Sequence, residues 1–244
     1  MSELITPTQP VQPPSLKDLS TVEQRIGLTF ANKNLLTQAL VHRSYLNENR
    51  SFPVGHNERL EFLGDAVLEL VITEYLYTHF DNPEGELTNW RASLVNSNML
   101  STLTTELNIE EFLYLSKGEQ KDNHGKARLK ILANVFESIV GAIYIEHGYE
   151  PAKKFILDRS LGKLDYILKN KLYLDPKTYF QEQAQEKLGV TPTYRVLREE
   201  GPDHNKTFTV AVHIGDAEVA VGTGSSKQAA QVNAAHRAIQ LKGW

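Results

Sequence analysis

The sequence contains no cysteine and no long hydrophobic run. Without cysteine among its 244 residues, the chain can form neither a disulfide nor a cysteine-ligated zinc site, and it has no thiol nucleophile. No apolar stretch approaches the roughly 20 residues that a membrane-spanning helix needs. Residues 1–14 combine neither a basic start nor an apolar core, so no secretory signal is visible. We therefore expect a cytoplasmic protein that contacts no membrane.

An excess of positive charge is also missing. The formal net charge is −4 at pH 7, and the sequence pI is about 6.1. This balance argues against binding nucleic acid through bulk positive charge, so any such binding must come from local patches or bridging metal ions. Hydrophobic residues make up 41% and charged residues 23% of the chain, as in ordinary globular proteins, and the length suffices for two modest domains.

Three carboxylates follow one another at helical spacing within residues 56–70. Glu58, Glu61 and Asp65 stand at i, i+3 and i+7, on one face of a predicted helix that should continue to about residue 80. Like charges at this spacing cost about 0.2–0.5 kcal/mol per pair even when exposed. A hard divalent cation such as Mg²⁺ would balance them. The alternative, which the spacing alone leaves open, is a solvated acidic face on an ordinary amphipathic helix.

A second predicted helix, residues 130–147, carries two polar positions in apolar surroundings. Asn134 and Glu137 lie three residues apart on one face, while Val135, Phe136 and Ile139 supply packing positions. A glutamate inside so apolar a helix needs a partner. An amide oxygen can ligate a hard cation, but it brings no negative charge, so Asn134 should weaken metal affinity.

The C-terminal part follows an α-β-β-β-α pattern. Asp175-Pro176 begins a helix, three alternating segments predict strands, and an alanine-rich helix runs from Lys227 to about residue 241. A lysine at a helix N-terminus opposes the helix dipole unless an anion such as phosphate lies nearby. The alternative for Lys227 is a solvated lysine without a ligand.

Several motifs in the first part resemble those of the ribonuclease III family. Residues 57–68 read N-E-R-L-E-F-L-G-D-A-V-L, which is similar to the family signature over an unbroken run. Residues 36–45 resemble the leading motif L-T-x-A-L-T-H-R-S-Y. Residues 132–144 resemble the second motif, A-D-x-F-E-A-x-x-G-A-I-Y, except that Asn134 stands where the family usually has Asp. The resemblance implies an all-α endonuclease domain over residues 20–169, after a disordered leader at 1–19.

The second part resembles a double-stranded-RNA-binding domain. The segments at 177–182, 201–204 and 222–227 are similar to its motifs K-T-x-L-Q-E, G-P-x-H and G-x-G-x-S-K. The resemblance implies a small α+β domain over residues 176–244, after a linker at 170–175. It also implies that Thr178, Gln181 and Glu182 face one minor groove, His204 the next, and Lys227 the phosphates between them. Few basic residues follow Lys227, so binding should be weak and salt-sensitive.

The same resemblance implies the metal site. Mg²⁺, which Mn²⁺ can replace, would be held by Glu61, Asp65, Asn134 and Glu137, with Asp65 and Glu137 as the catalytic pair. Two outer acidic positions of the family are matched by Glu58 and Glu84, which would lie outside the central metal cluster. Their role there would be to support the metal ligands, to bridge the dimer or to hold an outer metal, and the alternative for Glu84 is a plain acidic residue in a turn.

Together the two resemblances imply a metal-dependent endoribonuclease that cleaves double-stranded RNA in RNA processing. Its products would carry 5′-phosphate and 3′-hydroxyl ends with short 3′ overhangs. The enzyme would act as a homodimer, with Phe62 as a contact between the two copies. The rival hypothesis is a catalytically inactive, dimeric scaffold that binds double-stranded RNA. Retention of Glu61, Asp65 and Glu137 favours the enzyme, because a buried carboxylate without a metal is costly.

Overall fold

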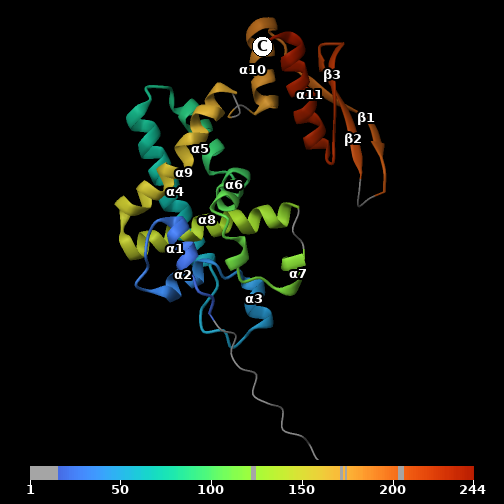
Figure 1. Cartoon of the computed structure of the whole chain (residues 1–244). Helices are drawn as coiled ribbons and strands as arrows, with labels where there is room; N and C mark the ends of the chain where they lie inside the picture. Colours follow the sequence, from blue (N-terminus) through green and yellow to red (C-terminus); the bar gives the residue numbers. More distant parts are fainter. Residues whose placement is uncertain (1–15, 122–124, 171–172, 174, 203–205) are drawn as a thin grey trace, which may run out of the picture. The chain divides into compact units, whose positions relative to one another are not determined.

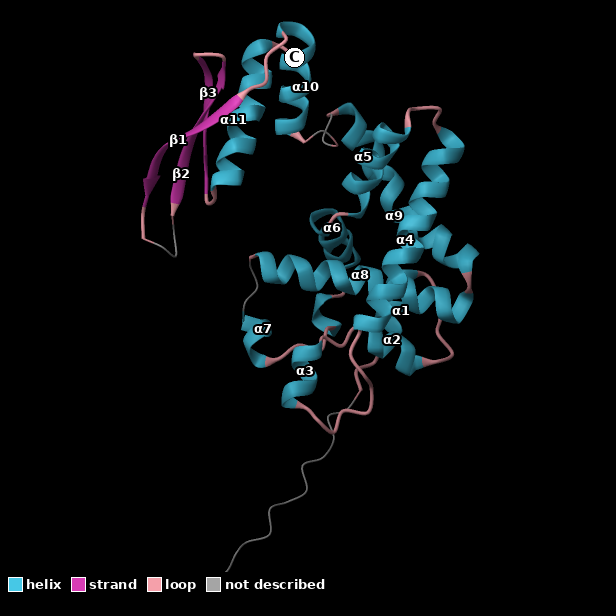
Figure 2. Ribbon diagram, turned by 180° about the vertical axis from the view of Figure 1, so that it is seen from behind, coloured by secondary structure: helices cyan, strands magenta, loops and turns pink. Residues whose placement is uncertain are grey.

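The computed structural model describes residues 16–121, 125–170, 173, 175–202 and 206–244. The chain forms two compact units, divided after Asn170. The first is built from helices, and the second combines a three-stranded antiparallel sheet with two helices (Figure 1, Figure 2). The predicted fold class is therefore confirmed. Within the described residues, no helix has the length and apolar character needed to cross a membrane.

The described part of the first unit contains three long helices, α4, α8 and α9, among shorter ones. Its described helices are α1 (Ser20–Ile26), α2 (Lys33–Ala39), α3 (Arg43–Glu48), α4 (Glu58–His79), α5 (Glu84–Val95), α6 (Ser97–Leu107), the 3-10 helix η1 (Glu110–Phe112), α7 (Lys117–Lys121), α8 (Lys126–His147) and α9 (Tyr149–Lys169).

The apolar spacing from Leu87 to Leu107 predicts one continuous helix, and this prediction is wrong. The structure has two helices there because Asn96 adopts an extended backbone with ψ of 157°. Its side-chain oxygen accepts a hydrogen bond from the backbone N–H of Met99 at 3.0 Å. Asn96 thus ends α5 and caps the N-terminus of α6, a role for which asparagine is well suited.

Helix α8 is the central element of the first unit. Helices α2, α4, α6 and α9 all pack against it, and it runs through the middle of this unit in Figure 1. Most of its side chains are consequently buried, among them Phe136, Ile139, Val140 and Ile143. A polar side chain on α8 therefore either needs a partner or must lie on the strip that the neighbouring helices leave open.

Helices α4 and α8 cross so closely that only glycine fits at the contact. A Cβ atom on Gly64 would lie 1.7 Å from the carbonyl oxygen of Glu137, and one on Gly141 would lie 2.3 Å from the carbonyl oxygen of Leu60. Both distances are far below van der Waals contact, so any larger residue must push the backbones apart. The crossing fixes the separation between the two helix faces that carry the predicted site.

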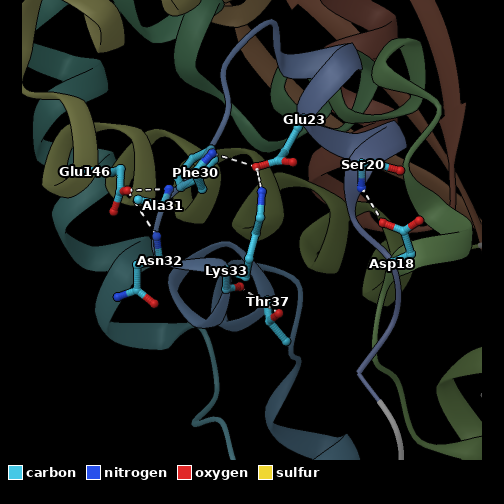
Figure 3. Close-up of polar contacts among 9 residues, drawn as sticks. All are labelled: Asp18, Ser20, Glu23, Phe30, Ala31, Asn32, Lys33, Thr37 and Glu146. Atoms are coloured by element: carbon cyan, nitrogen blue, oxygen red, sulfur yellow. Dashed lines mark hydrogen bonds and ion pairs between the residues drawn. The ribbon is translucent and has the colours of Figure 1, made fainter.

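Two carboxylates hold the segment between α1 and α2 (Figure 3). Glu23 accepts hydrogen bonds from the backbone N–H of Phe30 at 2.6 Å and from the ammonium of Lys33 at 2.5 Å. Glu146, near the end of α8, accepts from the backbone N–H groups of Ala31 at 2.8 Å and Asn32 at 3.2 Å. The segment is thereby attached to the central helix.

The start of the described chain also contacts this unit. Lys17 donates from its ammonium to the carbonyl oxygens of Glu111 at 2.8 Å and Leu113 at 2.9 Å. Leu19 is buried. Both residues fall in the segment that the sequence assigns to the leader, whereas residues 1–15 lie outside the described residues.

The second unit has the predicted α-β-β-β-α order. Helix α10 (Pro176–Leu188) is followed by β1 (Thr193–Glu200), β2 (Thr207–Ile214), β3 (Ala217–Gly224) and α11 (Lys227–Lys242). The strands pair antiparallel in the order β1-β2-β3, and both helices lie on one face of the sheet (Figure 2). The core joins Phe180, Val212 and the small residues of α11, and the ring of Trp244 stacks on Phe180 at 5.3 Å.

Glycines and alanines bring α11 close to β3. A Cβ atom on Gly222 would lie 2.2 Å from the backbone nitrogen of Ala234, and one on Gly224 would lie 2.6 Å from that of Ala230. The buried side of α11 carries alanine for the same reason, as at Ala235. The glycine-rich segment at the end of β3 therefore serves helix packing as well as the turn that leads into α11.

The α4–α8 crossing generates a stability prediction. Gly64→Ala should lower the free energy of unfolding by about 3 kcal/mol or more, because the new methyl group overlaps backbone rather than a movable side chain. The matched control is Gly162→Ala in α9, where a Cβ would meet nothing within 4 Å. That change should be neutral or stabilising by about 0.5–1 kcal/mol. Urea unfolding measures both, and equal effects of the two substitutions would show that the crossing is not tight.

Candidate active site

The carboxylates of α4 lie along the edge of its packed side, next to α8. Leu60, Leu68 and Val71 bury the adjoining side of the helix, as the 3.6-residue periodicity requires. Glu58 and Asp65 are exposed, and Glu61 is half-buried. The N-terminus of α4 is fixed by Asn57, which is buried and donates its backbone N–H to the carbonyl of Val41 at 2.9 Å.

Helix α8 supplies the other half of the site. Asn134 and Glu137 are both half-buried, between fully buried apolar neighbours. The side chain of Asn134 lies close enough to Glu61 to lower the pKa of that carboxyl against the larger effect of burial, and the charges of Asp65 and Glu61 act on Glu137. The structure therefore brings together the four residues that the sequence places in one metal site.

The electrostatics of this cluster are unfavourable for carboxylates alone. Burial, followed by the charges of Asp65 and Glu61, raises the pKa of Glu137 to about 8. Burial also raises the pKa of Glu61, and the neighbouring Glu58 adds to the effect. In addition, Oε2 of Glu61 is buried without a hydrogen-bond partner in the described structure. Negative charges held this way need a cation close by.

The donor atoms fit a hard divalent cation. All four side chains, Glu61, Asp65, Asn134 and Glu137, offer oxygen, which Mg²⁺ and Mn²⁺ prefer, and no sulfur or imidazole lies among them. Within the described part of the chain, no three aspartate, glutamate or histidine side chains already form a metal-binding group. Burial, and after it the charges of Asp65 and Glu61, disfavour the charged form of Glu137, and a bound cation would offset both effects.

Two basic side chains, Arg43 and Lys130, act on carboxylates of α4 at the cluster. The guanidinium of Arg43 pairs with Glu58 at 3.2 Å. The charge of Lys130 lowers the pKa of Glu61 against the larger effect of burial. Sequence reasoning missed Lys130, although its position four residues before Asn134 put it on the same face of α8.

Glu84 does not join the four-residue cluster. It begins α5, where its Oε1 accepts a hydrogen bond from the hydroxyl of Thr88 at 3.1 Å. It lines a cavity of about 790 Å³ between the C-terminal half of α4 and the start of α5. Glu58 is closer to the cluster, since its charge acts on Glu61.

Helix α4 also presents a stripe of exposed apolar side chains. Phe62 is 81% exposed, and Leu70 and Tyr77 follow on the same side with 56% and 80% exposure. Tyr77 contributes to the cavity beside Glu84. Large exposed aromatic residues in a row are typical of an interface.

The predicted RNA-facing residues of the second unit are exposed where the structure describes them. Thr178, Gln181 and Glu182 share one face of α10 at i, i+3 and i+4. His204 lies outside the described residues.

Lys227 is also exposed, but it has a partner. Its ammonium pairs with Glu199 at 2.6 Å and lies 5.6 Å from the centre of the Phe208 ring. Sequence reasoning missed this pairing, because β1 and α11 form it across the fold and no local pattern indicates it.

Comparison with known proteins matches both units. The Ribonuclease-III-like family matches residues 32–164, and the double-stranded RNA binding motif matches residues 176–242. Ribonuclease 3 of a Nitratiruptor species is 41% identical, over 93% of this chain and 97% of that protein. Ribonuclease 3 of Enterococcus faecalis is 40% identical, over 90% of this chain and 95% of that protein.

A solved structure supports the same relationship. The nuclease domain of ribonuclease III from Campylobacter jejuni is 39% identical, with a TM-score of 0.54, over 61% of this chain and 97% of that domain. The fold and the site thus define a class of protein, a helical nuclease domain followed by an RNA-binding module. The chain belongs to the ribonuclease III family.

The shifted pKa of Glu137 predicts how stability depends on pH. The folded, metal-free protein holds a proton on Glu137 up to about pH 8, whereas the unfolded chain releases it near the ordinary value of 4.5. The free energy of unfolding should therefore fall as the pH rises between these values. Glu137→Gln removes this titrating group. At about pH 8 its free energy of unfolding should exceed that of the wild type by about 1–2 kcal/mol, after allowance for partial exposure, and at low pH the two should differ little.

Urea unfolding in EDTA at the two ends of that pH range measures the effect. Asp165→Asn, which neutralises an exposed acid on α9, is the control and should show no such pH-dependent gain. A difference between Glu137→Gln and wild type that stays constant with pH would contradict the raised pKa.

Proposed function

We propose that this protein is an endoribonuclease that cleaves double-stranded RNA with the help of a divalent cation, in RNA processing in the cytoplasm. The observation that carries the proposal is the carboxylate cluster at the α4–α8 crossing. Membership of the ribonuclease III family and the RNA-binding motif at residues 176–242 support it. The family relationship also favours products with 5′-phosphate and 3′-hydroxyl ends and short 3′ overhangs.

Four side chains would hold Mg²⁺, or Mn²⁺ in its place: Glu61, Asp65, Asn134 and Glu137. When bound, such a cation lowers the pKa of a water molecule and neutralises charge on the phosphodiester as the 3′ oxygen leaves. Asp65 and Glu137 are the proposed catalytic pair, because the charge of Asp65 acts on Glu137 across the crossing of the two helices. Glu58 lies next to the cluster and orients Arg43 through their ion pair.

The second unit would hold the substrate. Thr178, Gln181 and Glu182 offer polar groups from one exposed face of α10, which suits contacts to 2′-hydroxyls in a minor groove. Lys227 would contact phosphates, and it must then exchange its ion pair with Glu199 for the phosphate. Because that exchange replaces one anion by another, binding should be weak and salt-dependent. His204 keeps its proposed place in the second minor groove.

We also propose a homodimer formed through the exposed stripe of α4. Phe62 and Tyr77 lie on the same side of this helix, and Tyr77 lines the cavity beside Glu84. A two-fold axis across this face would let Phe62 of each copy pack against apolar surface of the other, and one active site per strand would then act on a duplex. One structure of the Campylobacter jejuni domain describes structural flexibility in a region involved in dimer formation.

The rival function is an inactive scaffold that binds double-stranded RNA. Asn134 favours it, since this amide lacks the negative charge of an aspartate. The other members of the cluster oppose it. Glu61, Asp65 and Glu137 still repel one another, and Glu61 and Glu137 are partly buried. Such an arrangement costs free energy, so it has little reason to persist without a cation to bind.

Cleavage of a long perfect RNA duplex at low salt tests the catalytic proposal. The wild type should yield short duplexes with Mg²⁺ or Mn²⁺ and none with EDTA. Glu137→Gln should reduce cleavage to background, while Asn134→Asp should require less Mg²⁺, because it restores a charged ligand. Asp165→Asn is again the control and should cleave like wild type. A wild type that binds the duplex but leaves it intact with every metal would favour the scaffold.

Sedimentation tests the dimer. Phe62→Ala should raise the dissociation constant of the dimer about 10-fold or more, because the interface loses a buried aromatic side chain. Tyr166→Ala removes a 62% exposed aromatic side chain from α9 and should leave the association unchanged. If Phe62→Ala and Tyr166→Ala associate alike, the stripe on α4 is not the interface.

A further inference from the structure

Lys130 lies on the side of α8 that carries the site. It stands four residues before Asn134 and seven before Glu137, so the three side chains share one face of the helix. Lys130 is exposed, whereas Ile131 and Leu132, which follow it, are buried. Its ammonium therefore reaches solvent at the edge of the carboxylate cluster rather than packing into the core.

The ammonium of Lys130 has no direct partner there. Among the described residues, no hydrogen bond and no ion pair within 4.0 Å involves Lys130, whereas Arg43 is paired with Glu58. Glu61 is close enough for the charge of Lys130 to act on it. The residue one turn further along α8 is Asn134, an amide, so Lys130 lacks the i, i+4 ion pair that an aspartate would offer.

We propose that Lys130 binds a phosphate of the RNA strand next to the bond that is cut, and so positions the substrate in the active site. This inference rests on the proposed function. A phosphodiester that approaches a cluster of carboxylates meets repulsion, and a cation beside the cluster offsets it. Lys130 is suited to this contact because it lies at the site, extends into solvent and is not held by a carboxylate.

Asn134 would then also affect Lys130, in addition to the metal site. An aspartate at this position would attract Lys130 across one helical turn and compete with the phosphate for its ammonium. Asn134 leaves the ammonium available. The residue that weakens the metal site would thus favour contact with the substrate.

Binding of a short RNA duplex to the full chain tests the inference without cleavage. The measurement uses the Glu137→Gln background in Mg²⁺ and follows the dissociation constant as KCl is raised. Lys130→Gln should weaken binding about three- to tenfold at low salt and reduce the slope of log Kd against log [KCl] by about 1, as for the loss of one phosphate contact. Lys130→Arg should restore both values. Lys154→Gln, which removes a lysine paired with Asp158 on α9, should change neither.

The outcomes separate this inference from the proposed function. If the parent protein neither binds duplex RNA nor, with Glu137 intact, cleaves it, the proposed function fails. If both activities are present and Lys130→Gln behaves like Lys154→Gln, the inference is wrong and the function stands. An unchanged salt slope with a lower Mg²⁺ requirement for cleavage would also overturn it, because Lys130 would then only balance the charge of Glu61.

Discussion

The close crossing of α4 and α8 is the constraint on which the site depends. Gly64 and Gly141 let the two backbones touch, since a Cβ at either position would overlap a carbonyl group of the other helix. The contact leaves no freedom to slide or separate the helices. It therefore sets how near the carboxylates of α4 stand to Asn134 and Glu137, and the surrounding helices of the first unit serve to hold α8 in that position.

This proximity has a cost in electrostatic energy. Glu61 and Glu137 are partly buried, face like charges and have raised pKa values, so the metal-free cluster destabilises the fold that builds it. Cation binding turns the same repulsion into affinity, because each carboxylate then gains a counter-charge. Asn134 moderates both effects: as a neutral side chain it lowers the pKa of Glu61 instead of repelling its charge, and it offers the cation an oxygen without charge.

The second unit has no excess of positive charge, and it exposes only a few polar groups for contact with RNA. Small residues let α11 lie directly on β3, and the packed helix then directs its N-terminus, with Lys227, to the surface. The pairing of Lys227 with Glu199 keeps the isolated domain electrostatically balanced. Contact with RNA must compete with that pair, whereas Lys130 in the first unit faces no such competition among the described residues.

The sequence alone predicted the long helices and the three strands, and it indicated which residues share a helix face, whereas the short helix α7, in a segment read as a polar loop, was missed. Helical spacing placed Glu61 with Asp65 and Asn134 with Glu137, and strand alternation predicted the α-β-β-β-α order, because both patterns are local. Only the tertiary structure decided that these two faces meet, that Lys130 lies beside Glu61 and that Lys227 pairs with Glu199. Periodicity fixes the direction of a side chain about its own helix, but its burial, charge environment and partner depend on which other element packs against it.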